Sequence, residues 1–230
     1  FNAEIGHDAR EPRRQINIGR NSHDFESATC GFTIEDMRTV IRNGTVVNAD
    51  GRVEADVVIE GSLIVEVVAQ GRENVNADVE IDAAGMYVIP GGVDPHVHLE
   101  LDTGTTVSSD SFATGTIAAA HGGTTTIIDF AEQRIGGSVA RSFADRMTQA
   151  DGNCAIDWSL HQVLGGVDAQ ALIDTRNLLQ EGISSIKLFT AYPGRLYSDD
   201  GQILRALQMC ADTGMMAMVH AENGLAIDVL

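Results

Sequence analysis

The chain has 230 residues, of which 43% are hydrophobic, and its formal net charge at pH 7 is -18. This length and composition allow one large domain, or a large domain with a small companion, around a real hydrophobic core. The acidic charge argues against nucleic acid or an anionic membrane surface as a partner, because both would repel the protein.

The three cysteines, Cys30, Cys154 and Cys210, indicate neither a disulfide framework nor a thiolate metal site. Their number is odd, and no two of them are spaced as C-x-x-C. No apolar run approaches the roughly 18 residues that span a bilayer, and the first residues contain no apolar signal-peptide core. We therefore expect a protein of the reducing cytoplasm.

Residues 1–36 are polar and show no sustained period of 2 or 3.6 residues, which is typical of a loose tail. The chain opens with Phe1, and its first methionine, Met37, directly precedes the first clear strand pattern. We expect Met37 to be the natural start and the preceding residues to be a disordered extension or upstream sequence.

Short strand patterns occupy residues 37–88. Runs rich in valine and isoleucine are separated by the turn signals Asn43-Gly44, Asp50-Gly51 and Glu60-Gly61. This segment is predicted to form a small antiparallel β unit.

From about residue 89 the pattern changes to apolar strands that alternate with helical stretches. We predict strands over residues 87–89, 125–130, 156–162, 185–189 and 216–220. We predict helices over residues 110–121, 138–150, 169–181 and 200–213. Such alternation indicates an α/β fold with a parallel sheet, either open and doubly wound or a (β/α)8 barrel. If it is a barrel, about five of its units are present and the chain stops a little past half way round.

Lys187 is the only lysine, beside 14 arginines. An arginine stays charged, whereas a buried lysine amine can lose its proton and act as a nucleophile. The single lysine therefore marks a place where a guanidinium would not serve, although arginine-rich usage can also follow from genomic base composition alone.

His96-Val97-His98 follows the first strand of the alternating region. Side chains two residues apart in an extended segment point the same way, so both imidazoles can reach one metal ion. Two histidines at a strand end are also common as hydrogen-bonding surface residues. The position favours metal binding, because catalytic groups of parallel α/β proteins gather at the carboxyl ends of strands.

Lys187 lies in one predicted strand, and His220 ends the next strand, 33 residues later. This separation fits one strand–helix–strand repeat, so both side chains can project from equivalent ends of neighbouring strands. A neutral lysine that captures carbon dioxide becomes a carbamate, whose two oxygens can bridge two ions. The pattern therefore predicts four ligands, drawn from three strands, at one edge of the sheet.

Four motifs follow one another along the chain. They are Pro90-Gly-Gly-Val-Asp-Pro-His-Val-His-Leu, Asp110-Ser-Phe-Ala-Thr-Gly-Thr-Ile-Ala-Ala-Ala-His-Gly-Gly-Thr-Thr-Thr-Ile-Ile-Asp-Phe, Ser185-Ile-Lys-Leu-Phe-Thr-Ala-Tyr and Val219-His-Ala-Glu-Asn-Gly. In this order they resemble the cyclic amidohydrolases, most closely the dihydropyrimidinase and D-hydantoinase family. The resemblance covers about residues 37–230 and leaves residues 1–36 unexplained.

The resemblance implies a metal-dependent hydrolase of the urease type. Residues 89–230 would form the first part of a TIM-like (β/α)8 barrel, and residues 37–88 would form part of a small β-sandwich assembled from both chain ends. It also implies a site with two divalent metal ions, usually zinc.

The resemblance assigns a role to each candidate residue. His96 and His98 match ligands of the more buried ion, and His220 matches a ligand of the second ion. Lys187 matches the carboxylated lysine that bridges both ions. Tyr192 matches the tyrosine that hydrogen-bonds the substrate carbonyl.

The activity implied is hydrolysis of the cyclic amide bond of dihydropyrimidines or 5-substituted hydantoins to N-carbamoyl amino acids. The partner is then a small cyclic amide, and relatives are commonly homotetramers. The family also supplies a histidine from a sixth strand and an aspartate from an eighth, and neither is assigned in this sequence. We therefore expect the 230-residue chain to be a truncated enzyme that is inactive alone.

Three alternative functions are disfavoured by particular residues. Dihydroorotases typically carry an arginine two residues after the H-x-H motif, where this chain has Glu100. Allantoinases usually continue with a Glu-Pro-Gly-Arg-like run, which residues 101–105 lack. A non-catalytic scaffold related to dihydropyrimidinase would lack the metal ligands, and this sequence retains them.

Three further polar residues are weaker candidates. His121 lies at a predicted helix end, where histidine commonly caps carbonyls. His161 lies near the end of the third predicted strand, where ordinary packing competes with a role beside the metals. Asp129 ends the second strand and could support the site, although acidic residues are also frequent at exposed strand ends.

Overall fold

The computed structural model describes residues 37–72 and 75–230. These residues divide into two compact units, which meet in the sequence at Gly91 and Gly92. The predicted extension over residues 1–36 lies outside the described residues. No described helix is both long and apolar enough to cross a membrane.

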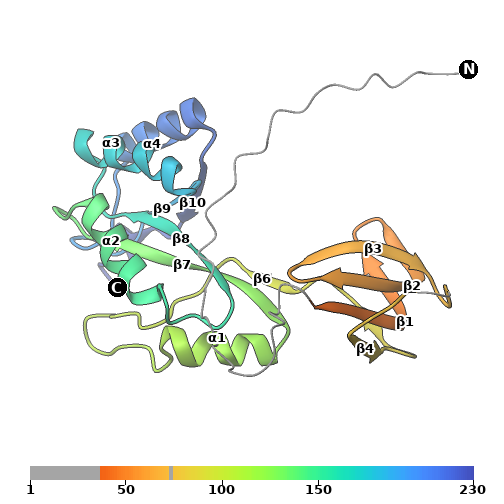
Figure 1. Ribbon diagram of the computed structural model, residues 1–230. Coiled ribbons are helices and arrows are strands. Elements are labelled where there is room, and N and C mark those ends of the chain that lie inside the picture. The colour runs from red at the N-terminus through yellow and green to blue at the C-terminus, as the bar shows by residue number, and fades with distance from the viewer. Residues whose placement is uncertain (1–36, 73–74) are drawn as a thin grey trace, which may run out of the picture. The chain divides into compact units, whose positions relative to one another are not determined.

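The smaller unit is a mixed five-stranded β-sheet (Figure 1). Its strands are β1 (Arg38–Asn48), β2 (Gly51–Glu60), β3 (Leu63–Ala69), β4 (Val79–Asp82) and β5 (Tyr87–Val88). β2 pairs antiparallel with both β1 and β3, whereas β4 and β5 run parallel to β1. The predicted antiparallel arrangement is correct for the first three strands and wrong for β4, because the chain crosses to the far side of β1 instead of closing another hairpin.

The strand predicted over residues 87–89 belongs to this sheet and not to the parallel one. Tyr87 pairs with Thr45 in β1. The parallel sheet begins instead at β6 (Gly92–Asp94), which pairs with β7. A short apolar run before Pro90 carries no signal for which of two sheets it joins.

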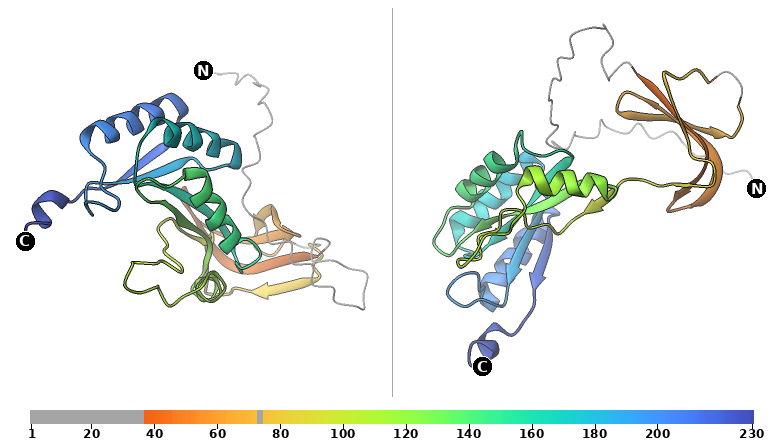
Figure 2. Two further views of the ribbon diagram at one scale, coloured as in Figure 1. Left: turned by 90° about the vertical axis from the view of Figure 1, so that its left-hand side faces the viewer. Right: turned by 90° about the horizontal axis from the view of Figure 1, so that it is seen from below.

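The larger unit is a five-stranded parallel sheet in the order β10-β9-β8-β7-β6. After β6 its strands are β7 (Thr124–Gln133), β8 (Asp157–Leu164), β9 (Ser185–Phe189) and β10 (Met216–His220). Its helices are α1 (Phe112–His121), α2 (Val139–Ala150), α3 (Ala169–Asn177) with the 3-10 turn η2 (Leu178–Glu181), α4 (Asp200–Thr213) and α5 (Gly224–Ile227). The sheet curls, and α2, α3 and α4 follow one another along one face (Figures 1 and 2). The parallel α/β prediction is confirmed as a curled half-barrel.

Alternation along the strands separates two environments. On β9, Ile186 and Leu188 are fully buried in the main core, on the side of the helices. Lys187 and Phe189 therefore point to the opposite, concave face. A second apolar cluster lies there, formed by Phe130, Val163 and Leu196 with Phe189 and Met218 packed against it.

Side chains that the sequence supplies define the helix boundaries. The N-terminal caps of the four longer helices are Ser111, Ser138, Asp168 and Asp199. Loss of one such cap costs about 1 kcal/mol of stability. α4 ends at Gly214, whose φ of 75° is a left-handed conformation that glycine adopts readily. These boundaries determine which residues remain in the loops that follow the strands.

Candidate metal centre

One pocket of about 620 Å³ lies on the concave face of the half-barrel. All five predicted site residues line it: His96, His98, Lys187, Tyr192 and His220. They come from the segment after β6, from β9, from the loop after β9 and from the end of β10. The structure therefore brings together residues that lie up to 124 positions apart in the sequence.

His96 and His98 follow β6 directly. Their ring centroids lie 5.1 Å apart in an edge-to-face arrangement. Both rings also contact the phenyl ring of Phe130, with centroid distances of 4.9 and 4.7 Å. Burial lowers the pKa of His98, which favours the neutral imidazole that binds metal ions.

The backbone around the histidine pair is held by the neighbouring strands. The Val97 amide donates to the Ile128 carbonyl at 3.2 Å, which continues the sheet beyond β6. The Pro95 carbonyl lies 2.9 Å from His161 Nε2, and the other ring nitrogen of His161 lies 2.5 Å from Ser185 Oγ. His161 thus contacts the backbone that leads to the histidine pair and is not among the residues that line the pocket.

Lys187 is 8% exposed and lies in the middle of β9. Its amine lies 5.9 Å from the centroid of the Phe130 ring and 5.5 Å from that of Phe189. Within the described part of the chain the amine forms neither a hydrogen bond nor an ion pair. Burial lowers the pKa of this amine, because a charged group loses its hydration there.

His220 ends β10 in register with Phe189. The two rings stack with a centroid distance of 5.4 Å, and the Tyr192 ring lies 5.7 Å from the imidazole. The carboxylate of Glu222 lies 2.7 Å from His220 Nε2. Tyr192 has a φ of 59°, which is rare for a bulky residue and is found most often where surrounding structure enforces it at functional sites.

The side chains fit a metal centre on one condition. Over residues 37–72 and 75–230, no three His, Cys, Asp or Glu side chains are gathered closely enough to hold one ion. The predicted set is instead an imidazole pair, a third imidazole and a lysine between them. Neutral imidazole nitrogens and carboxylate oxygens are suitable zinc ligands. This set supplies oxygen ligands only if Lys187 is carboxylated, and it does not include the further histidine and aspartate that the resemblance implies.

Comparison with known proteins identifies the family. The sequence profile of the amidohydrolase family matches residues 87–229, which is more than half of the chain. The chain belongs to the amidohydrolase family. This family is metal-dependent, which agrees with the type of side chains in the pocket.

Relatives of this amidohydrolase include a D-hydantoinase of Streptomyces coelicolor, which is 50% identical over 196 residues, or 84% of this chain and 42% of the relative. A D-hydantoinase of Geobacillus stearothermophilus is 41% identical, with 84% of this chain and 41% of the relative covered. The crystal structure of dihydropyrimidinase from Brevibacillus agri superposes with a TM-score of 0.80 at 40% identity, covering 84% of this chain and 42% of that one. The predicted resemblance is confirmed, and the chain spans about two fifths of the length of these relatives.

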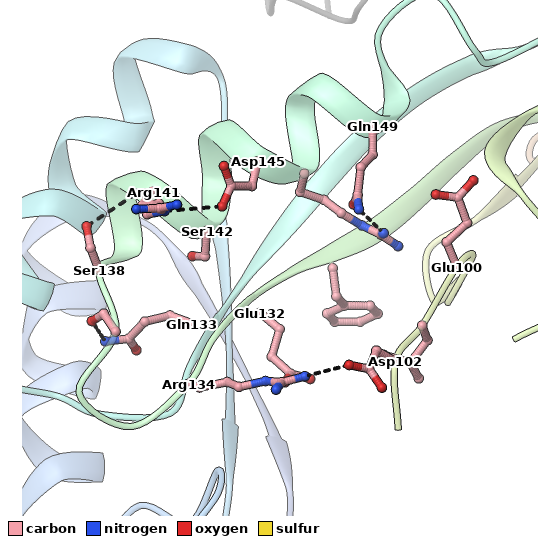
Figure 3. A pocket seen from close by; sticks show the side chains of 14 residues that line it. Glu100, Asp102, Glu132, Gln133, Arg134, Ser138, Arg141, Ser142, Asp145 and Gln149 are labelled. Atoms are coloured by element: carbon pink, nitrogen blue, oxygen red, sulfur yellow. Dashed lines mark hydrogen bonds and ion pairs between the residues drawn. The ribbon is translucent and has the colours of Figure 1, made fainter. Parts of the chain in front are cut away.

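A second pocket of about 440 Å³ lies beside the first in this amidohydrolase, between the loop at residues 100–102, the end of β7 and α2 (Figure 3). Charged side chains line it, but they pair with one another. Arg134 lies 3.5 Å from Asp102, and Arg141 lies 3.5 Å from Asp145. Because these charges satisfy each other, the pocket gives no indication of a ligand.

Of the two interpretations of Asp129, the exposed strand end is wrong. Its side chain is only 1% exposed and forms an ion pair with Arg146 of α2. The reason is the alternation along β7, which directs Asp129 toward the helices. His121 is the exposed last residue of α1 and does not line the pocket.

Two further contacts of the amidohydrolase pocket were not predicted. Arg195, which lines the pocket, donates hydrogen bonds to the carbonyls of Asp102 and Thr103 at 3.0 and 2.9 Å. No local pattern signals a contact over so long a separation. The second contact, between Glu222 and His220, could have been predicted. The two residues are two positions apart, and in an extended segment that spacing places both side chains on the same side.

Proposed function

We propose that the complete protein hydrolyses the cyclic amide bond of dihydropyrimidines or 5-substituted hydantoins. His96, His98, Lys187 and His220 would be among its ligands for two divalent metal ions, zinc by preference. Residues 89–230 would then be the first part of a (β/α)8 barrel, and residues 37–88 part of a β-sandwich, in a homo-oligomer. The resemblance to hydantoinases and dihydropyrimidinase over 84% of the chain supports this proposal.

The position of the Lys187 amine carries the proposal. The amine is buried between two phenyl rings, of which Phe130 contacts the H-x-H imidazoles and Phe189 contacts that of His220. Only a neutral amine attacks carbon dioxide, and desolvation favours that form. The nitrogen forms a bond to the carbon, one C=O electron pair moves onto oxygen, and the nitrogen loses a proton to water. The resulting carbamate has two oxygens, so that one could ligate the ion near the H-x-H pair and the other the ion near His220.

The pocket residues would share the work as follows. A bound divalent ion lowers the pKa of water and polarises a carbonyl group. Neutral imidazoles would hold the ions, and burial lowers the pKa of His98, which favours that form. Tyr192 would donate a hydrogen bond from its hydroxyl group to the substrate carbonyl oxygen, where negative charge develops. Water adds to the carbonyl carbon and loses a proton, the ring C–N bond breaks, and the leaving nitrogen takes up a proton, so that an N-carbamoyl amino acid is released.

Glu100 weighs against the dihydroorotase alternative. It occupies the position at which dihydroorotases typically carry an arginine. Its carboxylate accepts a hydrogen bond from the Phe112 amide at 3.2 Å, at the start of α1. It does not line the pocket of the candidate ligands. The residue at position 100 therefore supports a helix and offers no cation to a substrate carboxylate.

The test uses the complete protein and its Lys187→Arg and Lys187→Ala variants. We expect the parent to contain two zinc ions per subunit by elemental analysis and to hydrolyse dihydrouracil or hydantoin. Lys187→Arg should lose both properties, because a guanidinium does not form a carbamate. Lys187→Ala should recover part of the activity when a short carboxylate such as propionate is added.

A surface variant, Arg176→Lys on α3, serves as the control and should match the parent. A ¹³C carbamate signal from parent protein grown with labelled bicarbonate would identify the modified lysine directly. Full metal content and full hydrolysis in Lys187→Arg would show that the proposal is wrong.

A further inference from the structure

A buried ion pair holds both backbone polar groups of Leu99, the residue after His98. The Leu99 amide donates to Asp129 Oδ2 at 2.8 Å. The Arg146 guanidinium donates through Nη2 to the Leu99 carbonyl and through Nε to Asp129 Oδ1 at 3.0 Å. Carboxylate, guanidinium and peptide groups therefore form a closed ring of hydrogen bonds.

The ion pair is well enclosed and well satisfied. Asp129 is 1% exposed and Arg146 is 9% exposed. Arg146 also donates to the side chain of Gln149 at 2.8 Å and lies 4.6 Å over the ring of Phe112. Buried charges are stable only when partners replace the lost water, so this geometry leaves the pair little freedom to move.

The side chain of Leu99 is fixed as firmly as its backbone. It is 7% exposed and belongs to the main core, together with Phe112 of α1. α1 passes it at Gly115, where a Cβ atom would overlap a methyl group of Leu99. Leu99 is therefore a fixed point directly beside the second histidine of the pair.

β7 supports the histidine pair from both faces of the sheet. Asp129 points toward the helices and holds the backbone after His98. The next residue, Phe130, points into the pocket and contacts the rings of both histidines. Two consecutive residues of one strand thus hold the backbone and the side chains of the same motif.

We propose that Asp129 and Arg146 are positioning residues that set the geometry of the H-x-H pair for metal binding. This inference rests on the proposed metal centre. Neither residue lines the pocket that contains the candidate ligands, so both act through Leu99. A lysine at position 146 would keep the charge, but it lacks the planar fork that reaches Asp129 and the Leu99 carbonyl together.

The experiment measures the Zn²⁺ dissociation constant of the metal-free complete protein by competition with a chromophoric chelator. Arg146→Lys should weaken zinc binding about tenfold, the lower range for changes to groups that orient metal ligands. An Asp129→Leu/Arg146→Met double variant should weaken it similarly. Because the double variant removes both buried charges, it leaves no unpaired charge to unfold the protein.

Arg141→Met is the matched control on the same helix. Arg141 is exposed and pairs with Asp145, four residues along α2 (Figure 3). This variant should keep both the parent's dissociation constant and its thermal midpoint. All measurements are made at a temperature at which circular dichroism shows each variant to be folded.

The outcomes separate the two proposals. If the parent protein binds no zinc, both the proposed metal centre and the proposed positioning role are refuted. A parent that binds zinc tightly, with folded variants of equal affinity, keeps the metal centre and refutes the positioning role. Unfolding of both variants also refutes it, since the pair would then serve the fold alone. Weaker zinc binding in a folded variant supports it.

Discussion

Phe189 and His220 are register partners on β9 and β10, and their rings stack with a centroid distance of 5.4 Å. The same phenyl ring lies 5.5 Å from the Lys187 amine. Phe130 has the corresponding place on the other side, 5.9 Å from that amine and in contact with the imidazoles of the H-x-H motif. Each group of candidate ligands therefore has its own aromatic ring, and the lysine lies near both.

This arrangement predicts that mutations can weaken the binding of either metal ion separately. In the complete protein, Phe189→Leu should give the His220 ring more freedom to move. Binding of the second zinc ion, which His220 would ligate, should weaken about tenfold, with little effect on the first ion. Phe130→Leu should have the reverse effect, because it frees the H-x-H imidazoles. A two-site calorimetric titration with Zn²⁺ measures both constants. Equal weakening of both ions by either variant would contradict separate support.

The strands and helices near the pocket could be predicted closely from sequence. β9, β10 and α4 occupy the predicted residues because their apolar periods end at strong local signals. Asp199 caps the start of α4, and Gly214 ends it. The sheet membership of residues 87–89 could not be predicted, because it depends on pairing with β1, about 40 residues earlier.

In the site, too, contacts set by local spacing could be predicted and contacts between distant segments could not. Spacing placed His96 beside His98 and placed Lys187 and His220 on neighbouring strands, and these relations are local to a strand or a single repeat. The partner of Asp129 is supplied by α2, and no periodicity reports which helix side chain reaches a strand.

Arg195 is expected to hold the loop at residues 101–107 to the chain segment that follows β9. It bonds to the carbonyls of Asp102 and Thr103, and its side chain is 36% exposed. Arg195→Ala should speed amide hydrogen exchange in that loop several-fold. The loop can then open locally without breaking these two hydrogen bonds. The thermal midpoint should change little, since partly exposed polar contacts contribute little to stability.

Arg176→Ala provides a matched comparison for this loop. Arg176 forms an exposed pair with Asp212 at 3.3 Å, away from residues 101–107. Mass spectrometry of exchanged peptides should show parent behaviour in the loop of this variant. Unchanged exchange in Arg195→Ala would mean that the loop is held by its own hydrogen bonds, such as that from the Ser108 amide to the Leu101 carbonyl.

Cys154 should make the protein less stable at alkaline pH. It is a free, buried thiol, and burial raises its pKa from 9.0 to about 12. Between these values the unfolded chain loses the proton while the folded chain keeps it, so stability falls as pH rises above about 9. The urea concentration at the unfolding midpoint should therefore decrease more between pH 7 and pH 10 in the parent than in Cys154→Ala.

The thiol's reactivity gives an independent measurement. The thiolate is the reactive form, so iodoacetamide at pH 9 should label Cys154 far more slowly in the folded protein than in urea. Cys210 is likewise free and buried, with a raised pKa, and should show the same protection by peptide mass spectrometry. Equal labelling rates in both states would refute the prediction for either residue.

His161 should contribute stability that disappears in acid. Its ring lies within hydrogen-bonding distance of the Pro95 carbonyl and Ser185 Oγ, and burial lowers its pKa from 6.5. His161→Phe fills similar space but removes both bonds, which should cost about 1–3 kcal/mol at pH 8. As pH falls below 6.5, the unfolded chain gains a proton that the folded ring resists, so the parent's advantage should shrink. Urea titrations at pH 8 and pH 5.5 measure this difference, with His121→Phe at the exposed end of α1 as a control that should show none.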